Sequence, residues 1–119
     1  MLAVKKIGTG QISLDVRAEG EIRYITSVQE VVELWKEGAE GKIALVDDAG
    51  TTTLSPVLSK LAGVVCTSGG LGSHLAIVTR EFDIPALMGL ELENPELLDK
   101  SRVAIEPDGG TSGTLISLE

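Results

Sequence analysis

Residues 66–89, CTSGGLGSHLAIVTREFDIPALMG, constrain the fold of this chain more than any other segment. They follow a short apolar run at 63–66 that is typical of a buried strand, and they open with a glycine-rich turn. Apolar residues then recur four, three and four positions apart, which is the spacing of one helix face. These residues are Leu71, Leu75, Val78 and Phe82. Pro85 ends that pattern, and residues 85–90 predict another strand, so the segment as a whole predicts an α/β domain.

The rest of the chain adds elements of the same class. Residues 2–18 and 21–25 predict a pair of strands, and residues 42–46 predict a short apolar strand. Ser27 is expected to cap a helix with Glu30 three residues later, and residues 54–61 predict a second helix with Pro56 in its first turn. The tail predicts a hairpin that turns at 107–110. The apolar face of the first helix is predicted to consist of Val28, Val31, Val32 and Trp35.

Composition excludes several classes of protein. With 119 residues, 43% of them hydrophobic, residues 1–119 are expected to form a single domain. The net charge of −8, without a basic stripe, argues against nucleic-acid partners. One Cys and one His exclude an intramolecular disulfide and a zinc site built from these residue types alone. Because no long apolar run or cleavable leader is present, we expect a soluble, cytoplasmic protein with no membrane partner.

The residues with chemical potential lie in the glycine-rich turn. Gly69, Gly70 and Gly72 allow tight turning and close approach to a ligand, and His74 falls in the first turn of the helix that follows. The amides at a helix start, with the positive end of the helix dipole, favour an anion, and phosphate is the natural candidate. The same dipole disfavours imidazolium by roughly 0.3–1 kcal/mol, so His74 is expected to be a neutral nucleophile able to attack a phosphoryl group.

Several neighbouring residues have two interpretations. The hydroxyls of Thr67 and Ser73 either bind a phosphoryl oxygen or simply cap the turn and helix. Arg80 lies about 240° around the helix from His74, which favours a salt bridge or an interface contact over phosphate binding. Cys66 could pair with His74 for thiol catalysis, but its place in an apolar strand favours a buried small hydrophobe.

A metal site at two neighbouring aspartates is not favoured. Asp47 and Asp48 could together hold Mg²⁺, but adjacent side chains on a strand point to opposite faces, and an acidic loop is usually only solvated. We therefore expect no metal on this chain.

The segment also resembles a known signature. Thr67, Gly69-Gly70, Ser73-His74, Ala76-Ile77, Arg80-Glu81, Ile84-Pro85-Ala86 and Gly89 are similar to the phosphohistidine motif of the swivelling domain of phosphoenolpyruvate-utilising enzymes, among them phosphoenolpyruvate synthase and pyruvate phosphate dikinase. This resemblance implies a three-layer β/β/α swivelling domain. It implies that His74 is the phosphorylated residue, with Thr67, Gly69, Gly70, Gly72 and Ser73 around the phosphate.

The resemblance also implies partners. ATP and Mg²⁺ are expected on an ATP-grasp-like nucleotide-binding domain or subunit, and the phosphoryl group is expected to pass to a PEP/pyruvate-binding or other acceptor domain. The chain departs from the motif at Gly72, where many members have a threonine that is phosphorylated in some dikinases, and at Leu75 and Thr79, where alanine is usual. The regulatory switch at Gly72 is therefore not expected.

Three functions follow from these observations. The first is a phosphoryl carrier that is not catalytic alone. The second is a non-catalytic anion-binding or regulatory module of the same fold, and the third is a small hydrolase that uses Cys66 and His74. The sequence leaves open the acceptor, the oligomeric state, the ring nitrogen used and whether the chain is an excised domain or a free-standing subunit.

Overall fold

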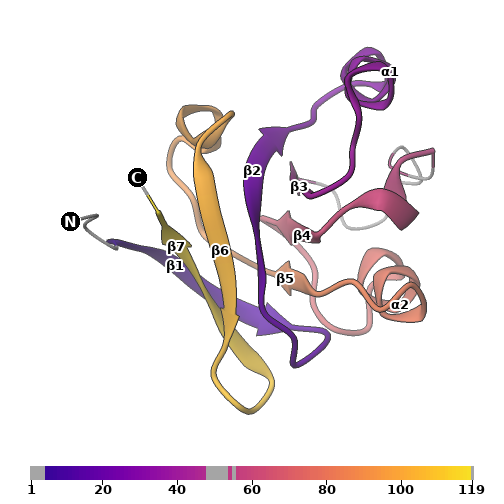
Figure 1. The fold of residues 1–119 in the computed structure, drawn as a ribbon. Helices are drawn as coiled ribbons and strands as arrows, with labels where there is room; N and C mark the ends of the chain where they lie inside the picture. Colours follow the sequence, from indigo (N-terminus) through magenta and orange to yellow (C-terminus); the bar gives the residue numbers. More distant parts are fainter. Residues whose placement is uncertain (1–4, 48–53, 55, 119) are drawn as a thin grey trace.

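A computed structural model describes residues 5–47, 54 and 56–118 (Figure 1). The elements in chain order are β1 (Lys5–Ile12), β2 (Ala18–Tyr24), α1 (Val28–Glu37), β3 (Lys42–Val46), the 3-10 helix η1 (Leu58–Lys60), β4 (Gly63–Cys66), α2 (His74–Glu81), β5 (Ala86–Met88), the 3-10 helix η2 (Pro95–Leu98), β6 (Arg102–Pro107) and β7 (Ser112–Ser117). The predicted α/β class is confirmed. The predicted strand at 42–46 and the C-terminal hairpin of β6 and β7 are also confirmed.

The strands form one closed ring in the order β1-β5-β4-β3-β2-β6-β7. Strands β2, β3, β4 and β5 are parallel to one another, and the remaining pairs are antiparallel. The predicted pairing between the first two strands is wrong. Strand β1 instead pairs with β7 and β5, and β2 pairs with β3 and β6. Strands β2 and β3 are parallel, and the helix α1 forms the crossover connection that parallel neighbours require.

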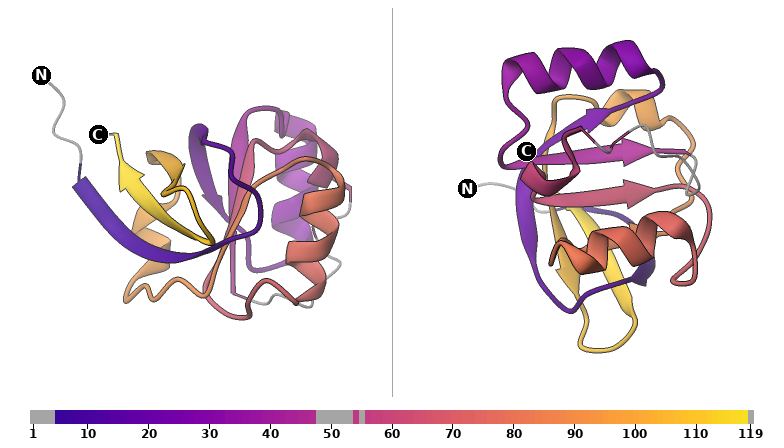
Figure 2. Two further views of the ribbon diagram at one scale, coloured as in Figure 1. Left: turned by 90° about the horizontal axis from the view of Figure 1, so that it is seen from below. Right: turned by 90° about the vertical axis from the view of Figure 1, so that its right-hand side faces the viewer.

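Alternate side chains of the parallel strands serve two separate cores. Ile43, Leu45 and Val65 point into the ring, where they pack with residues such as Ile105 and Leu115. Their neighbours along the strands point outward and pack under the helices; Ala44, Val46, Val64 and Cys66 belong to this second cluster with residues of α1 and α2. The two helices cover the outer face of the parallel strands, as the two views in Figure 2 show. This layering places the carboxyl ends of β3 and β4 beside the start of α2.

The helix capped by Ser27 is confirmed, but its predicted apolar face is partly wrong. The Ser27 side chain accepts a hydrogen bond from the amide of Glu30 at 3.3 Å, as expected of an N-cap. The helix buries Val31 and Leu34, whereas Val28, Val32 and Trp35 are 67%, 43% and 55% exposed. The face of the helix that packs against the sheet is therefore the one that carries Val31 and Leu34.

Two other predicted helices are shorter than expected. Within 54–61 the described residues contain only η1, and Pro56 precedes it in a turn. Helix α2 begins at His74 and ends at Glu81, so Leu71 and Phe82 lie outside it, and Phe82 is 50% exposed. The inner face of α2 consists of Leu75, Ala76 and Thr79, and the Thr79 hydroxyl donates to the Leu75 carbonyl at 2.8 Å. In the part of the chain that the structure describes, neither α-helix is long and apolar enough to cross a membrane.

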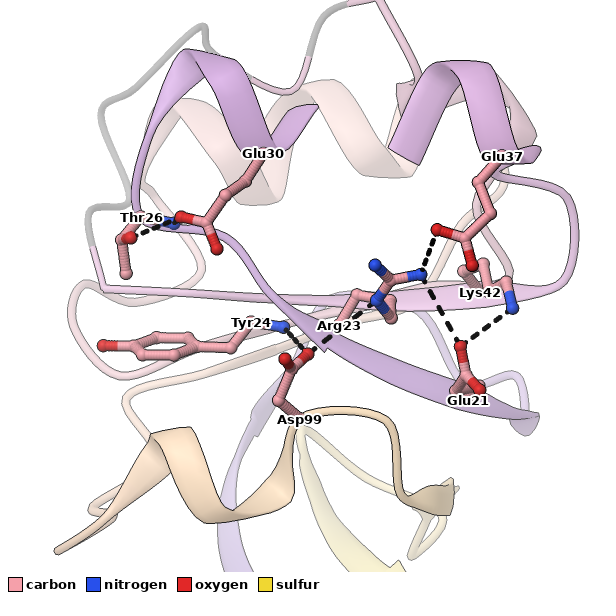
Figure 3. Close-up of polar contacts among 8 residues, drawn as sticks. All are labelled: Glu21, Arg23, Tyr24, Thr26, Glu30, Glu37, Lys42 and Asp99. Atoms are coloured by element: carbon pink, nitrogen blue, oxygen red, sulfur yellow. Dashed lines mark hydrogen bonds and ion pairs between the residues drawn. The ribbon is translucent and has the colours of Figure 1, made fainter. Parts of the chain in front are cut away.

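An ion-pair network fixes α1 to the strands below it (Figure 3). Arg23, with a side chain only 12% exposed, donates to Glu37 at 2.8 Å at the end of α1. The Nε of Arg23 also lies 3.8 Å from Asp99 after η2, and the Asp99 carboxylate accepts the amide of Tyr24 at 2.9 Å. These contacts join the end of β2, including the backbone of Tyr24, to the end of α1 and to the residue after η2.

Candidate functional site

His74 is the first residue of α2 and its side chain is exposed. The preceding Ser73 caps the helix: its hydroxyl donates to the Gly70 carbonyl at 2.7 Å and accepts the amide of Ala76 at 3.4 Å. The amides of His74 and Leu75 have no hydrogen-bond partner among the described residues. An exposed imidazole therefore stands beside open backbone donors at the positive end of a helix, which is an arrangement that favours an anion.

The three glycines of the turn have different structural roles. Gly69 adopts φ +76°, a left-handed conformation that favours glycine, and a Cβ at Gly89, itself at φ +72°, would lie 3.2 Å from the Gly69 carbonyl. A Cβ at Gly70 would meet only the mobile end of the Gln11 side chain, at 2.9 Å, and one at Gly72 would meet nothing within 4 Å. Backbone conformation thus favours glycine at position 69, position 72 is open to ligand approach, and position 70 has only the end of the Gln11 side chain beside it.

Asp47, at the end of β3, anchors the first part of this turn. Its carboxylate accepts the Thr67 hydroxyl at 2.8 Å and the Tyr24 hydroxyl at 2.6 Å, on different oxygens. Its backbone carbonyl accepts the Ser68 hydroxyl at 2.6 Å. The hydrogen bond to Asp47 and, to a lesser degree, burial raise the pKa of Tyr24 to about 12. The carboxyl ends of three neighbouring strands are tied together at one carboxylate.

This geometry bears on the two hydroxyls whose roles the sequence left open. Ser73 is the helix cap, and its proton is committed to the Gly70 carbonyl. Thr67 directs its proton to Asp47, so its oxygen can accept a hydrogen bond but does not donate to a ligand in this conformation. Both hydroxyls therefore have structural hydrogen-bond partners, which agrees with the capping role that was one of the two interpretations.

The remaining candidate residues lie apart from His74. Cys66 is fully buried in the core under the helices, as the interpretation as a small hydrophobe requires, with Sγ 3.9 Å from the Ser68 hydroxyl. Arg80 is exposed and forms no ion pair within the described residues, so the salt bridge predicted as one alternative is not present there.

The described residues offer no metal site. Asp48 lies outside them, and Asp47 is engaged with Tyr24 and Thr67. Residues 5–47, 54 and 56–118 contain no cluster of three or more His, Cys, Asp or Glu side chains arranged to hold a metal ion.

Sequence reasoning missed the role of Tyr24. Tyr24 ends one strand and Asp47 follows another, 23 positions later in the chain. Neither residue indicates this contact by itself. Only if β2 and β3 are recognised as parallel neighbours do their carboxyl ends, with Tyr24 and Asp47, fall side by side. The predicted strand pair at the N-terminus concealed this.

Comparison with known proteins places the site in a family. The family described as PEP-utilising enzyme, mobile domain, matches residues 38–110, a range that includes the turn, α2 and the strands on either side. The chain belongs to this family. The mobile domain resembles a probable phosphoenolpyruvate synthase of Archaeoglobus fulgidus, with 31% identity over 93 residues, 78% of this chain and 12% of that protein.

Two further relatives also match most of this chain. The phosphoenolpyruvate synthase of Aquifex aeolicus is 32% identical over 110 residues, 92% of this chain and 12% of that protein. The rifampicin phosphotransferase of Streptomyces sviceus is 30% identical over 95 residues, 80% of this chain and 10% of that protein. The chain spans about a tenth of the length of these relatives.

Proposed function

We propose that this mobile domain carries a phosphoryl group on His74 between a donor site and an acceptor site located on other domains. The observation that supports the proposal most directly is the exposed imidazole on the first residue of α2, beside the open amides of His74 and Leu75. Gly72 leaves open space where a side chain would stand, and at Gly70 only the end of the Gln11 side chain lies close. We also propose that the domain has the three-layer β/β/α arrangement. The two separate cores on either side of the parallel strands support this part of the proposal.

The transfer requires little of this chain beyond a nucleophile and charge stabilisation. A ring nitrogen lone pair attacks the phosphorus atom, a P–N bond forms, and the P–O bond to the leaving group breaks, so the leaving oxygen takes the electron pair. The open amides and the helix dipole stabilise the oxygens of the phosphoryl group while it is attached to the ring. The reverse displacement, by an acceptor oxygen, restores the free imidazole.

Donor and acceptor lie outside this chain in the proposal. An ATP-grasp-like domain would supply the phosphoryl group from ATP with Mg²⁺, and a separate domain would present the acceptor. The relatives carry names as different as phosphoenolpyruvate synthase and rifampicin phosphotransferase, which supports the idea that the acceptor is chosen elsewhere. The acidic surface of this chain, with a net charge of −8, would favour docking to basic phosphate-binding sites.

The test separates nucleophilicity from docking. The chain is treated with phosphoramidate, a small chemical donor that needs no partner, and in parallel with a nucleotide-binding partner domain, ATP and Mg²⁺. One phosphoryl group is expected on His74 in both reactions, stable in alkali and lost in mild acid. Cys66→Ala should label normally and His74→Ala should not.

Three outcomes would count against the carrier function. An acid-stable label, or one that persists in His74→Ala, places the phosphate on another residue type. A chain that binds inorganic phosphate near His74 but accepts no phosphoryl group from either donor is an anion-binding or regulatory module. A hydrolytic activity that is lost when a thiol-specific reagent modifies Cys66 would favour the hydrolase that uses Cys66 and His74.

A further inference from the structure

The backbone of β1 has an open edge over much of its length. Strand β1 pairs with β7 from Lys5 to Gln11, but it pairs with β5 only at Gln11 and Ile12. Along 5–10 the edge that faces away from β7 has no ladder partner in the described part of the chain. In Figure 2 the beginning of β1 accordingly extends away from the rest of the ring. An open edge of this kind exposes amide and carbonyl groups that can pair with another extended segment.

Three shallow hollows that share Glu91 in their lining lie beside that edge, and together they are called the groove. One hollow, of about 440 Å³, is lined by Ile7 of β1 and by residues of the 91–98 segment, and a second lies between Gly8, Thr9, Gly89 and Glu91. A third joins Glu91 to Thr67, so the groove reaches the turn that precedes His74. Its floor is apolar, because Leu92 and Leu98 are partly buried against the inner core. Leu97, which also lines it, is 74% exposed.

Charges on the rim narrow the choice of occupant. Glu91 and Glu93 are exposed and form no ion pair within the described residues, and no Lys or Arg lines any of the three hollows. Lys5 and Lys6 are exposed at the beginning of β1, and the ladder to β7 is irregular between Lys6 and Gly8. If the β1 strands of two copies of this chain paired antiparallel, these lysines of one copy would approach the open edge of the other. The irregularity between Lys6 and Gly8 limits regular pairing to the residues from Gly8 onward.

We propose that the β1 edge and the groove beside it bind an extended polypeptide segment with alternating apolar and basic side chains. The segment adds a strand alongside Gly8 and Thr9, places apolar side chains over Leu92 and Leu97, and places lysine or arginine against Glu91 and Glu93. Main-chain hydrogen bonds supply affinity, and the apolar floor and acidic rim supply specificity. This inference does not depend on phosphorylation of His74.

The probe is a blocked six-residue peptide of alternating lysine and valine, titrated into isotopically labelled chain and followed by amide NMR. Shifts and slowed hydrogen exchange are expected at Gly8, Thr9 and Glu91. The same peptide methylated at its backbone amides should lose these effects because it cannot donate to a strand edge. A peptide with glutamate in place of lysine should not bind.

Matched variants test the rim. Replacing both Glu91 and Glu93 by glutamine should weaken binding about three- to tenfold, as expected for two exposed ion pairs. Glu33→Gln on α1, with Glu40→Gln in the turn after it, removes the same charge from two residues that line none of the three hollows, and should have no effect. Leu97→Ser should weaken binding without loss of fold, because Leu97 is largely exposed.

Other results would overturn the proposal. Binding that survives backbone methylation would show that no strand is added. Dimerisation of the chain with protection of the same amides would assign the edge to a second copy. Unchanged amide spectra at millimolar peptide would leave the groove without this occupant.

Discussion

The hydroxyl of Tyr24 donates to the Asp47 carboxylate at 2.6 Å, and the same carboxylate accepts the Thr67 hydroxyl on its other oxygen. This contact joins the end of β2 to the turn that leads to His74. It raises the pKa of Tyr24 to about 12, because ionisation would lose the donated proton and place two negative charges side by side.

The first prediction concerns this phenol. The chain contains one tyrosine, so ultraviolet absorbance of the phenolate reports Tyr24 alone. The midpoint should lie near 12 in the folded protein and close to 10 in urea. Because the folded pKa is the higher one, the stabilisation is complete below about pH 10 and is lost as pH rises towards 12. Asp47→Asn should lower the folded midpoint; an unchanged midpoint would contradict the contact.

The second prediction concerns the turn itself. Asp47→Asn should weaken the hold on Thr67, while the Ser68 hydroxyl keeps its backbone acceptor. Faster amide exchange is expected at residues 67–70, with little change in α1, and labelling of His74 should slow. Asp108→Asn, in the exposed hairpin turn, is the control and should change neither measurement. Equal effects of the two variants would mean that Asp47 does not position the turn.

The third prediction separates the glycines. Gly69→Ala should lower the free energy of unfolding by about 1–2 kcal/mol, since alanine is strained at positive φ. Gly72→Ala should be close to neutral, because no atom lies within 4 Å of its Cβ. Gly70→Val should keep the fold, as a Cβ at this position meets only the Gln11 side chain, but it should slow phosphoryl acceptance by crowding the open amides. Urea denaturation and the labelling assay measure the two effects separately.

The fourth prediction compares the helix caps. Ser73→Ala should cost about 0.5–2 kcal/mol of stability because it removes the cap of α2, whereas His74→Ala should cost little because the ring is exposed. At α1, the Thr26 hydroxyl holds the pKa of Glu30 below its usual range. That contribution is present above the unfolded pKa and is lost as acid protonates the folded carboxylate, so Glu30→Gln should flatten the acid side of the stability profile. Chemical denaturation at several pH values checks both expectations.

Local chemistry determined much of this protein from the sequence alone. Ser27 and Glu30 fixed the start of α1, the apolar run at 42–46 fixed β3, and the Gly-rich turn placed His74 at the start of α2. Each of these depends on residues within a few positions of one another, where capping, alternation and backbone preference act directly.

Tertiary structure decided which elements meet. The first two strands are not partners, α1 turns Trp35 to solvent, and Tyr24, Asp47 and Thr67 converge on one carboxylate. None of these is a local property, because strand pairing and helix rotation depend on how two apolar cores are filled at once. The sequence placed the proposed nucleophile, and the parallel order of β2, β3 and β4 placed the groups that hold its turn.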